Sequence, residues 1–237
     1  MPRFTIQHLT QYQYKLYAQY SANRLMLYPL VDDFQKIIRQ EIFITGNPIV
    51  STYQDYYGNE VGTFTLIEPH LTLTIDSHIE VETRTRTLPI DTLSAQEAWQ
   101  HLFTNITHLP MHEFLVEESF SYLEDVQKVY NEVFQSSLTP LQLSMTFCDY
   151  IFSTYKYVKG ITSVDTTIEE IWQHKSGVCQ DFAHVLLMFL RKAKIPSRYV
   201  SGYICPHQNG MRGEGATHAW VEVYLPNYGW LGIDPTN

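Results

Sequence analysis

The stretch that decides the fold is Ser176-Gly177-Val178-Cys179-Gln180-Asp181, which runs directly into Phe182-Ala183-His184. Apolar residues at 182, 183, 186, 187 and 190 keep the spacing of one helix face and predict a mostly buried helix. Gly177 supplies a tight turn before this helix, and Asp181 lies in its first turn, where the helix dipole favours a carboxylate. Cys179 is therefore expected at or beside the helix N-terminus, where unpaired N–H groups favour the thiolate, the reactive form of cysteine.

A base and a carboxylate follow further along the chain. Residues 216–225 alternate β-branched and aromatic side chains and predict a strand, and residues 226–229 are a turn signal before a second strand at 230–234. In the resulting antiparallel hairpin, His218 and Asp234 fall at roughly opposed positions, within reach of each other. A carboxylate that orients an imidazole, which in turn activates a thiol, is the logic of a catalytic triad.

These residues resemble the transglutaminase-like superfamily, a circularly rearranged relative of the papain-type fold. Four blocks occur in the family's order, around Cys179, at 195–203, around His218 and at 229–236. The resemblance implies that Cys179 is the nucleophile, His218 the base and acid, and Asp234 the orienting carboxylate. The superfamily includes protein crosslinkers, cysteine peptidases, amidases and members that have lost activity, so the resemblance alone leaves the reaction open.

Gln180, Tyr157 and Trp220 are candidates for stabilising an oxyanion or lining the substrate cleft. The backbone N–H of Cys179 is the safer oxyanion donor, because it comes with the helix start whatever the side chains do. Trp220 completes the family pattern around His218. Tyrosines close to a helix end, such as Tyr157, are more often packing residues.

Other polar residues have plainer explanations. Cys205 and His207 form a Cys-x-His pair, but no second pair with zinc-site spacing exists, so no metal site is expected. No loop has the alternating Asp/Asn pattern of a calcium site, and no cofactor is expected. Cys148 is expected in the core, and His184 in packing or support of the site. The glycine-rich residues 209–215 predict either a lid beside the site or a floppy connection.

Composition excludes several classes of protein. The chain has 16 Lys and Arg against 25 Asp and Glu, a net charge of −9, which argues against a nucleic-acid partner. Three cysteines at wide spacing suit a reducing compartment rather than a disulfide framework. The N-terminus has no apolar signal region, and the longest apolar run, residues 185–190, is too short to span a bilayer. We expect a cytoplasmic protein of bacterial type with no membrane partner.

The fold class is predicted as α+β, with residues 1–90 forming an antiparallel β-sandwich or barrel. The clearest alternation is at 71–83, where most of the odd positions are apolar. Residues 23–29, 34–35 and 55–59 resemble the N-terminal β-domain of bacterial transglutaminase-like proteins. Residues 55–60 are predicted as the turn of a hairpin whose strands are 49–53 and 61–67.

Residues 91–138 are predicted as a helical linker region, with a capping box at Ser94 and Glu97. Residues 139–237 form the predicted papain-like and transglutaminase-like core, which opens with a helix capped by Thr139 with Pro140 as its first residue. Family members usually continue past Asp-Pro-Thr with further strands. The end at Asn237 predicts either a truncated chain or a sheet that ends early, with Asp234 held less rigidly.

The leading hypothesis is thiol-dependent acyl transfer on a peptide or carboxamide substrate. Hydrolysis is favoured over crosslinking, because no second amine-binding feature is visible in the sequence. The alternatives are protein-glutamine transglutaminase activity and a non-catalytic peptide-binding module, whose cleft would hold extended chains. The sequence indicates neither the substrate's identity nor the oligomeric state.

Overall fold

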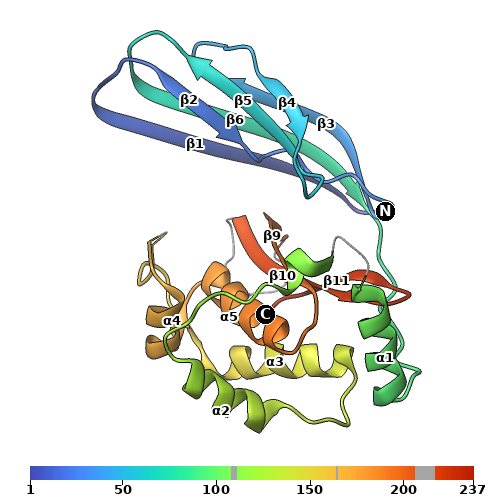
Figure 1. Cartoon of the computed structure of the whole chain (residues 1–237). Coiled ribbons are helices and arrows are strands. Elements are labelled where there is room, and N and C mark those ends of the chain that lie inside the picture. The colour runs from blue at the N-terminus through green and yellow to red at the C-terminus, as the bar shows by residue number, and fades with distance from the viewer. Residues whose placement is uncertain (108–110, 164, 206–216) are drawn as a thin grey trace. The chain divides into compact units, whose positions relative to one another are not determined.

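A computed structural model describes residues 1–107, 111–163, 165–205 and 217–237 of the chain. The chain divides into two compact units, Met1–Leu88 and Pro89–Asn237 (Figure 1). Each unit has a hydrophobic cluster of its own. None of the described helices is long and apolar enough to cross a bilayer. The predicted α+β class is confirmed, because the first unit is built from strands and the second mixes helices and strands.

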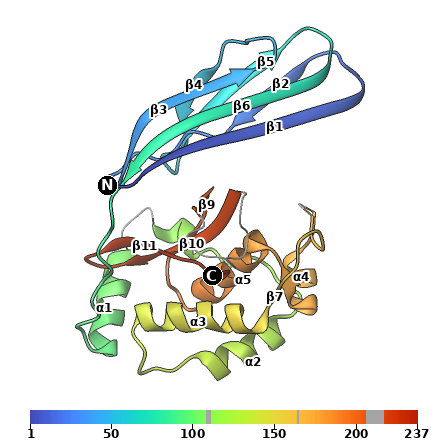
Figure 2. The ribbon, with the colours of Figure 1, turned by 180° about the vertical axis from the view of Figure 1, so that it is seen from behind.

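The first unit consists of two three-stranded antiparallel sheets. One has the order β1 (Arg3–Ala18), β6 (His70–Thr83), β3 (Gln35–Ile44), and the other the order β2 (Ser21–Leu25), β5 (Glu60–Leu66), β4 (Ser51–Gln54). Figure 2 shows both sheets from behind.

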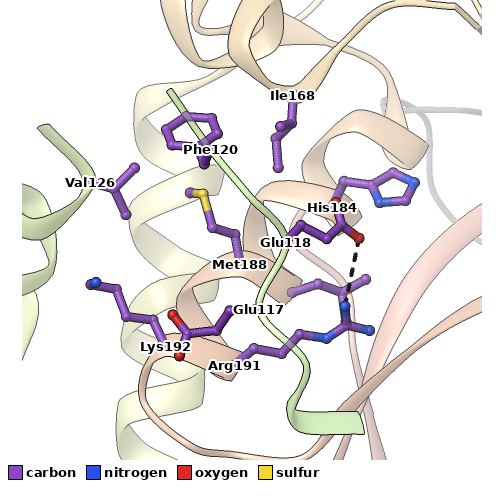
Figure 3. A pocket seen from close by; sticks show the side chains of 10 residues that line it. Glu117, Glu118, Phe120, Val126, Ile168, His184, Met188, Arg191 and Lys192 are labelled. Carbon is purple, nitrogen blue, oxygen red and sulfur yellow. Dashed lines mark ion pairs between the residues drawn. The ribbon is translucent and has the colours of Figure 1, made fainter. Parts of the chain in front are cut away.

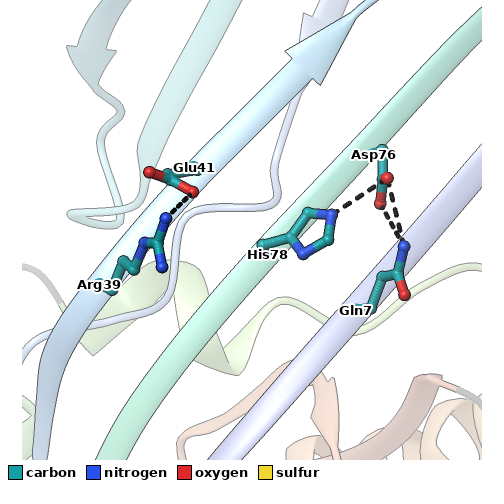
Figure 4. Close-up of polar contacts among 5 residues, drawn as sticks. All are labelled: Gln7, Arg39, Glu41, Asp76 and His78. Carbon is teal, nitrogen blue, oxygen red and sulfur yellow. Dashed lines mark hydrogen bonds and ion pairs between the residues drawn. The ribbon is translucent and has the colours of Figure 1, made fainter.

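Alternation along β6 determines which face of its sheet is buried. Leu73, Ile75, Ile79 and Val81 are buried, as the odd-numbered pattern predicts, and Leu73 and Ile75 pack with residues of the other sheet in one cluster. The opposite face of the sheet carries a group of bonded polar side chains (Figure 4): there Gln7 and His78 both bond the carboxylate of Asp76. Arg39 and Glu41 form a further ion pair on this sheet.

The second unit contains a three-stranded antiparallel sheet and its helices. The sheet has the order β11 (Gly229–Ile233), β10 (Thr217–Leu225), β9 (Ser197–Tyr203), and a short parallel pair joins β7 (Lys156–Tyr157) to β8 (Ser176–Gly177). The helices are α1 (Ala95–Ile106), the 3₁₀ helix η1 (Met111–Leu115), α2 (Leu123–Val133), α3 (Pro140–Thr154), α4 (Ile168–His174) and α5 (Cys179–Lys192).

Helix α5 is the centre of this unit's core. Its residues Phe182, Leu186 and Phe189 are fully buried, and Phe189 stacks on Phe147 of α3 with ring centroids 5.0 Å apart. On its other side α5 packs against β10. Because the helix is enclosed by α3 and by the sheet, its N-terminal end and the strands β10 and β11 are held in fixed relation.

The helix starts follow the local signals. The capping boxes at Ser94 with Glu97 and at Thr139 with Gln142 are both formed, and Pro140 is the first residue of α3, as predicted. Helix α2 was not predicted as a separate helix. Tyr122 precedes it without a side-chain cap bond, so the usual sequence signal for a helix start is missing.

Candidate active site

Helix α5 begins at Cys179, and a buried carboxylate holds the turn before it. Oδ2 of Asp181 accepts the backbone N–H of Val178 at 2.7 Å and the hydroxyl of Thr162 at 2.7 Å. Asp181 is only 3% exposed. From the first turn of α5 it therefore caps the helix that carries Cys179, by accepting the N–H of the residue before the helix.

Gly177 is required here for space rather than for a left-handed backbone. It is not among the residues with positive φ. A Cβ atom at this position would lie 2.4 Å from Oδ2 of Asp181, far inside van der Waals contact. The predicted tight turn thus has a specific cause, because only glycine lets the Asp181 carboxylate pass close beneath the chain.

Strands β10 and β11 bring His218 and Asp234 together. Their antiparallel register pairs Val221 with Ile233, and the continuation of the two strands places Nε2 of His218 2.8 Å from Oδ2 of Asp234. His218 is 2% exposed. Because a carboxylate can only accept, Nε2 carries the proton of this bond.

Asp234 has two further donors. The backbone N–H of Thr236 lies 2.9 Å from its Oδ1, and Nδ2 of Asn237 lies 2.9 Å from its Oδ2. The expectation that Asp234 is held loosely is therefore not matched, since three separate groups fix the carboxylate against the imidazole.

Cys179 lies beside the other side of the imidazole ring. Nδ1 of His218 is buried and makes no hydrogen bond of normal geometry to any residue in the described ranges. Hydrogen bonds of active sites are often long before a substrate binds. Burial, the largest influence, opposes ionisation of the half-buried thiol, yet His218 and the backbone N–H groups of Ala219 and Gln180 together lower the pKa of Cys179.

The same contacts favour the charged imidazole. Burial is again the largest single influence and disfavours the charge, but Asp234 and Cys179 outweigh it and raise the pKa of His218 to about 9. Burial also disfavours the Asp234 carboxylate, and bonds from His218, Asn237 and Thr236 overcome it and lower the pKa of Asp234. These shifts favour the ionised form of each of the three groups relative to the same group in water.

The three residues predicted to border the site lie around it. Gln180 is half-buried in the first turn of α5. Tyr157 lies on β7, and its pKa is raised first by burial and then by the charges of Cys179 and Asp181. Trp220 stacks on His218, with centroids 6.3 Å apart and planes 24° apart.

Two glycines make room for the Trp220 indole on the sheet. A Cβ atom at Gly202 of β9 would lie 2.5 Å from Cη2 of Trp220, and one at Gly232 of β11 would lie 3.4 Å from its Nε1. The indole therefore lies flat across the sheet, beside His218.

Two residues of this site were not predicted from the sequence. Tyr199 of β9 stacks on His184 with centroids 5.2 Å apart, and burial followed by the charges of Cys179 and Asp181 raises its pKa. The sequence marked Tyr199 only as part of the block at 195–203 that resembles the family. Thr162 gave no signal. His184 itself is exposed and packs on Tyr199, in line with the packing role expected for it.

The remaining cysteines have different surroundings. Cys148 is buried, as predicted, and burial raises its pKa to about 12. Cys205 is exposed. His207 and the predicted lid at 209–215 lie outside the described residues. Among the residues that are described, no group of three His, Cys, Asp or Glu side chains could hold a metal ion.

Comparison with known proteins agrees with this fold. Residues 127–235 match the family model of the transglutaminase-like superfamily, and residues 4–82 match that of the bacterial transglutaminase-like N-terminal region. An uncharacterised protein of Mycobacterium tuberculosis is 30% identical over 249 residues, which cover 99% of this chain and 79% of the relative.

Two further proteins carry descriptive names. The crystal structure of a candidate cysteine protease from Cytophaga hutchinsonii superposes with a TM-score of 0.75 at 20% identity, covering 99% of this chain and 76% of that one. A protein-glutamine gamma-glutamyltransferase of Pseudomonas aeruginosa is 36% identical over 80 residues, 32% of this chain and 12% of the relative. The chain belongs to the transglutaminase-like superfamily, and its first unit is a bacterial transglutaminase-like N-terminal region.

Proposed function

We propose that Cys179, His218 and Asp234 form a catalytic triad for thiol-dependent acyl transfer on peptide or carboxamide substrates. One observation carries the proposal: His218 lies between the Asp234 carboxylate, at 2.8 Å, and the thiol of Cys179, whose pKa it lowers. A lowered thiol pKa beside an imidazole with a raised pKa is the charge state that a cysteine nucleophile needs.

The reaction then proceeds in two balanced steps. The thiolate attacks the carbonyl carbon, and the electron pair moves onto the carbonyl oxygen. His218 gives its proton to the departing amine as the C–N bond breaks, which leaves a thioester on Cys179. Water attacks the thioester while neutral His218 takes a proton from the water. The C–S bond breaks, and the acid, the thiolate and the imidazolium are formed.

Donors for the oxyanion are available at the start of α5. The backbone N–H of Cys179 belongs to the unpaired first turn of the helix, and the Gln180 side chain lies next to it. The Tyr157 hydroxyl, whose pKa is raised in part by the charge of Cys179, is a further candidate donor. We assign Trp220 to the wall of the cleft, because its indole lies flat beside His218.

Hydrolysis is the reaction that we favour, and transfer to an amine is the second candidate. The name of the Pseudomonas aeruginosa relative supports transfer, although the match covers only 32% of this chain. A glutamine-containing peptide should be incubated with and without a primary amine, and ammonia and isopeptide product measured together. If the isopeptide product forms as fast as ammonia is released, the reaction is transfer to an amine and the assignment of hydrolysis is wrong.

The triad itself is tested by the pH dependence of iodoacetamide labelling, measured site by site by mass spectrometry. Cys205 is exposed and serves as the internal reference thiol. Cys179 should label faster than Cys205 below neutral pH, because its pKa is lowered, and His218→Ala should remove the difference.

The opposite result has a clear meaning. If Cys179 labels no faster than Cys205 in the wild type, the triad is not assembled. The protein is then better explained as a non-catalytic module that holds extended peptides in the same cleft.

A further inference from the structure

The segment that follows β7 is fastened at two points to the start of α5. The backbone N–H of Val158 donates to the carbonyl of Gly177 at 2.9 Å, and the hydroxyl of Thr162 donates to Oδ2 of Asp181 at 2.7 Å. Gly160, with a φ of +77°, allows the chain to turn between these points. The half-buried Thr162 is therefore held beside the start of the helix that carries the proposed nucleophile.

Asp181 brings a negative charge into the turn of the nucleophile. It lies in the same first turn of α5 as Cys179, and its side chain is buried. A carboxylate beside a thiol disfavours the thiolate, because like charges repel each other, and most strongly where water is excluded. The position of this carboxylate therefore bears on the reactivity of the thiol.

The two anions have separate sets of hydrogen-bond donors. Oδ2 of Asp181 lies against the chain before the helix, 2.7 Å from the backbone nitrogen of Val178, and accepts the Thr162 hydroxyl there. The thiolate of Cys179 is favoured instead by His218 and by backbone N–H groups of β10 and α5. We propose that Thr162 is a positioning residue for the reaction: its hydroxyl holds the Asp181 carboxylate against the chain before the helix and so limits the repulsion between this charge and the thiolate. This inference rests on the function proposed above.

Tyrosines and an arginine on neighbouring elements leave the charge of Asp181 in place. Burial, followed by the charges of the thiol and of this carboxylate, raises the pKa of Tyr157 on β7 and of Tyr199 on β9, so both are neutral below about pH 9. Arg191 lies about 15 Å farther along the axis of α5 and pairs with Glu118 at 3.7 Å. Figure 3 shows this pair beside a depression of about 30 Å³, which has room for about one water.

The test compares two substitutions of Thr162 that differ in the hydroxyl. Thr162→Val removes the donor and keeps the shape of the side chain, whereas Thr162→Ser keeps the donor. Thr166→Val is the matched control, because the hydroxyl oxygen of Thr166 accepts the backbone N–H of Ser163 at 2.8 Å, a bond of the same segment that does not involve Asp181. Circular dichroism checks that each variant is folded, and Thr162→Ala replaces Thr162→Val if that variant is not.

The measured quantity is the rate at which iodoacetamide labels Cys179 between about pH 5 and about pH 9, with Cys205 as the reference thiol. In Thr162→Val the pH of half-maximal labelling should rise by about 0.5–1, so that the rate at about pH 6 falls about 3- to 10-fold. A purely structural role of the hydroxyl would lower stability without moving this pH. Thr162→Ser and Thr166→Val should both keep the wild-type pH of half-maximal labelling.

The part played by charge is tested by the same comparison in an Asp181→Asn background. An uncharged amide does not repel the thiolate, so adding Thr162→Val should move the pH of half-maximal labelling by only about 0.2 or less. A shift as large as that in the wild-type background would mean that the hydroxyl acts by another route, and the proposal would be wrong. If Asp181→Asn does not fold, the Thr162 variants decide alone.

Failure of this proposal differs from failure of the triad. Suppose that Cys179 of the wild type labels faster than Cys205 below neutral pH. Equal profiles of Thr162→Val and Thr166→Val would then show that Thr162 only ties the segment to the helix, and the triad would stand. If Cys179 of the wild type labels no faster than Cys205, the proposed function is wrong and so is the role given to Thr162.

Discussion

At the scale of single residues, Asp181 is the side chain that organises the start of α5. Its carboxylate binds Val178 and also Thr162, which lies 19 residues earlier in the chain. One buried carboxylate thus binds both the turn that presents Cys179 and Thr162.

Gly177→Ala should destabilise the protein, because the new methyl group would lie 2.4 Å from Oδ2 of Asp181. We expect a loss of about 1–3 kcal/mol in the free energy of unfolding, measured in urea, and slower labelling of Cys179. The control is Gly177→Ala combined with Asp181→Ala. In that background the alanine at 177 should cost much less, so additive losses would contradict the explanation.

Lys175 should make stability depend on pH. Its Nζ lies 3.0 Å from the centroid of the Trp172 ring and 3.0 Å from the hydroxyl of Tyr155. Burial lowers the pKa of Lys175 to about 8, and Asp125 opposes this only in part. Since the unfolded chain keeps the ordinary lysine pKa of about 10.4, it binds more protons than the folded chain between these values.

The stability of the wild type relative to Lys175→Met should therefore rise as pH increases from about 8 to about 10. Urea unfolding of both proteins across this range measures the difference. A difference that is constant with pH, or that falls, would show that the folded protein does not disfavour the ammonium at this position.

At the scale of secondary-structure elements, the sheet β11-β10-β9 has glycines at the positions that contact the indole of Trp220. Trp220 of β10 lies over Gly202 of β9 and Gly232 of β11, and it stacks on His218. A side chain on either neighbouring strand would press on this ring. The two glycines are not equivalent, because the contact at Gly202 would be much closer than that at Gly232.

Gly202→Ala and Gly232→Ala form a matched pair. Gly202→Ala should displace the indole, change tryptophan fluorescence and lower the free energy of unfolding by about 1–3 kcal/mol. Gly232→Ala, with its nearest contact at 3.4 Å, should change stability by about 0.5 kcal/mol or less. Equal effects of the two substitutions would mean that the indole is not confined as described.

The elements with strong local signals could be predicted from the sequence. The periodicity after Gly177 predicted α5, and the alternation in residues 71–83 predicted β6. The position of the hairpin turn predicted that His218 and Asp234 lie within reach of each other, and in the structure they form a hydrogen bond. Helix α2 was missed because no cap residue marks its start.

Contacts between distant segments could not be predicted in this way. Thr162 bonds Asp181 across 19 residues of sequence, and no local sequence pattern at either residue predicts the other as its partner. Tyr199 sits in an ordinary strand pattern, and its place beside His184 follows only from how β9 packs on α5. Such partners are decided by packing rather than by propensity.

At the scale of the whole molecule, the two units have separate cores. Leu73 belongs to the cluster of the first unit and Leu143 to that of the second, and both are fully buried. All four tryptophans, at 99, 172, 220 and 230, lie in the second unit. Tryptophan fluorescence therefore reports on Pro89–Asn237 alone, whereas circular dichroism reports on both units.

Leu73→Ala and Leu143→Ala should each destabilise their own unit by about 2–5 kcal/mol. In urea unfolding, Leu143→Ala should shift the fluorescence transition to lower urea, and Leu73→Ala should leave that transition in place while shifting part of the circular dichroism signal. If Leu73→Ala moved the fluorescence transition as far as Leu143→Ala, the units would unfold as one.

The alternation along β10 has a consequence for protein engineering. From Ala219 onward the odd positions Ala219, Val221, Val223 and Leu225 are buried in the core, whereas the even positions Trp220, Glu222 and Tyr224 are only partly buried. A mutagenesis library that varies the even positions changes the face shared with His218, while one that varies the odd positions mostly yields unfolded protein. New substrate preferences should therefore be sought by randomising every second residue of this strand.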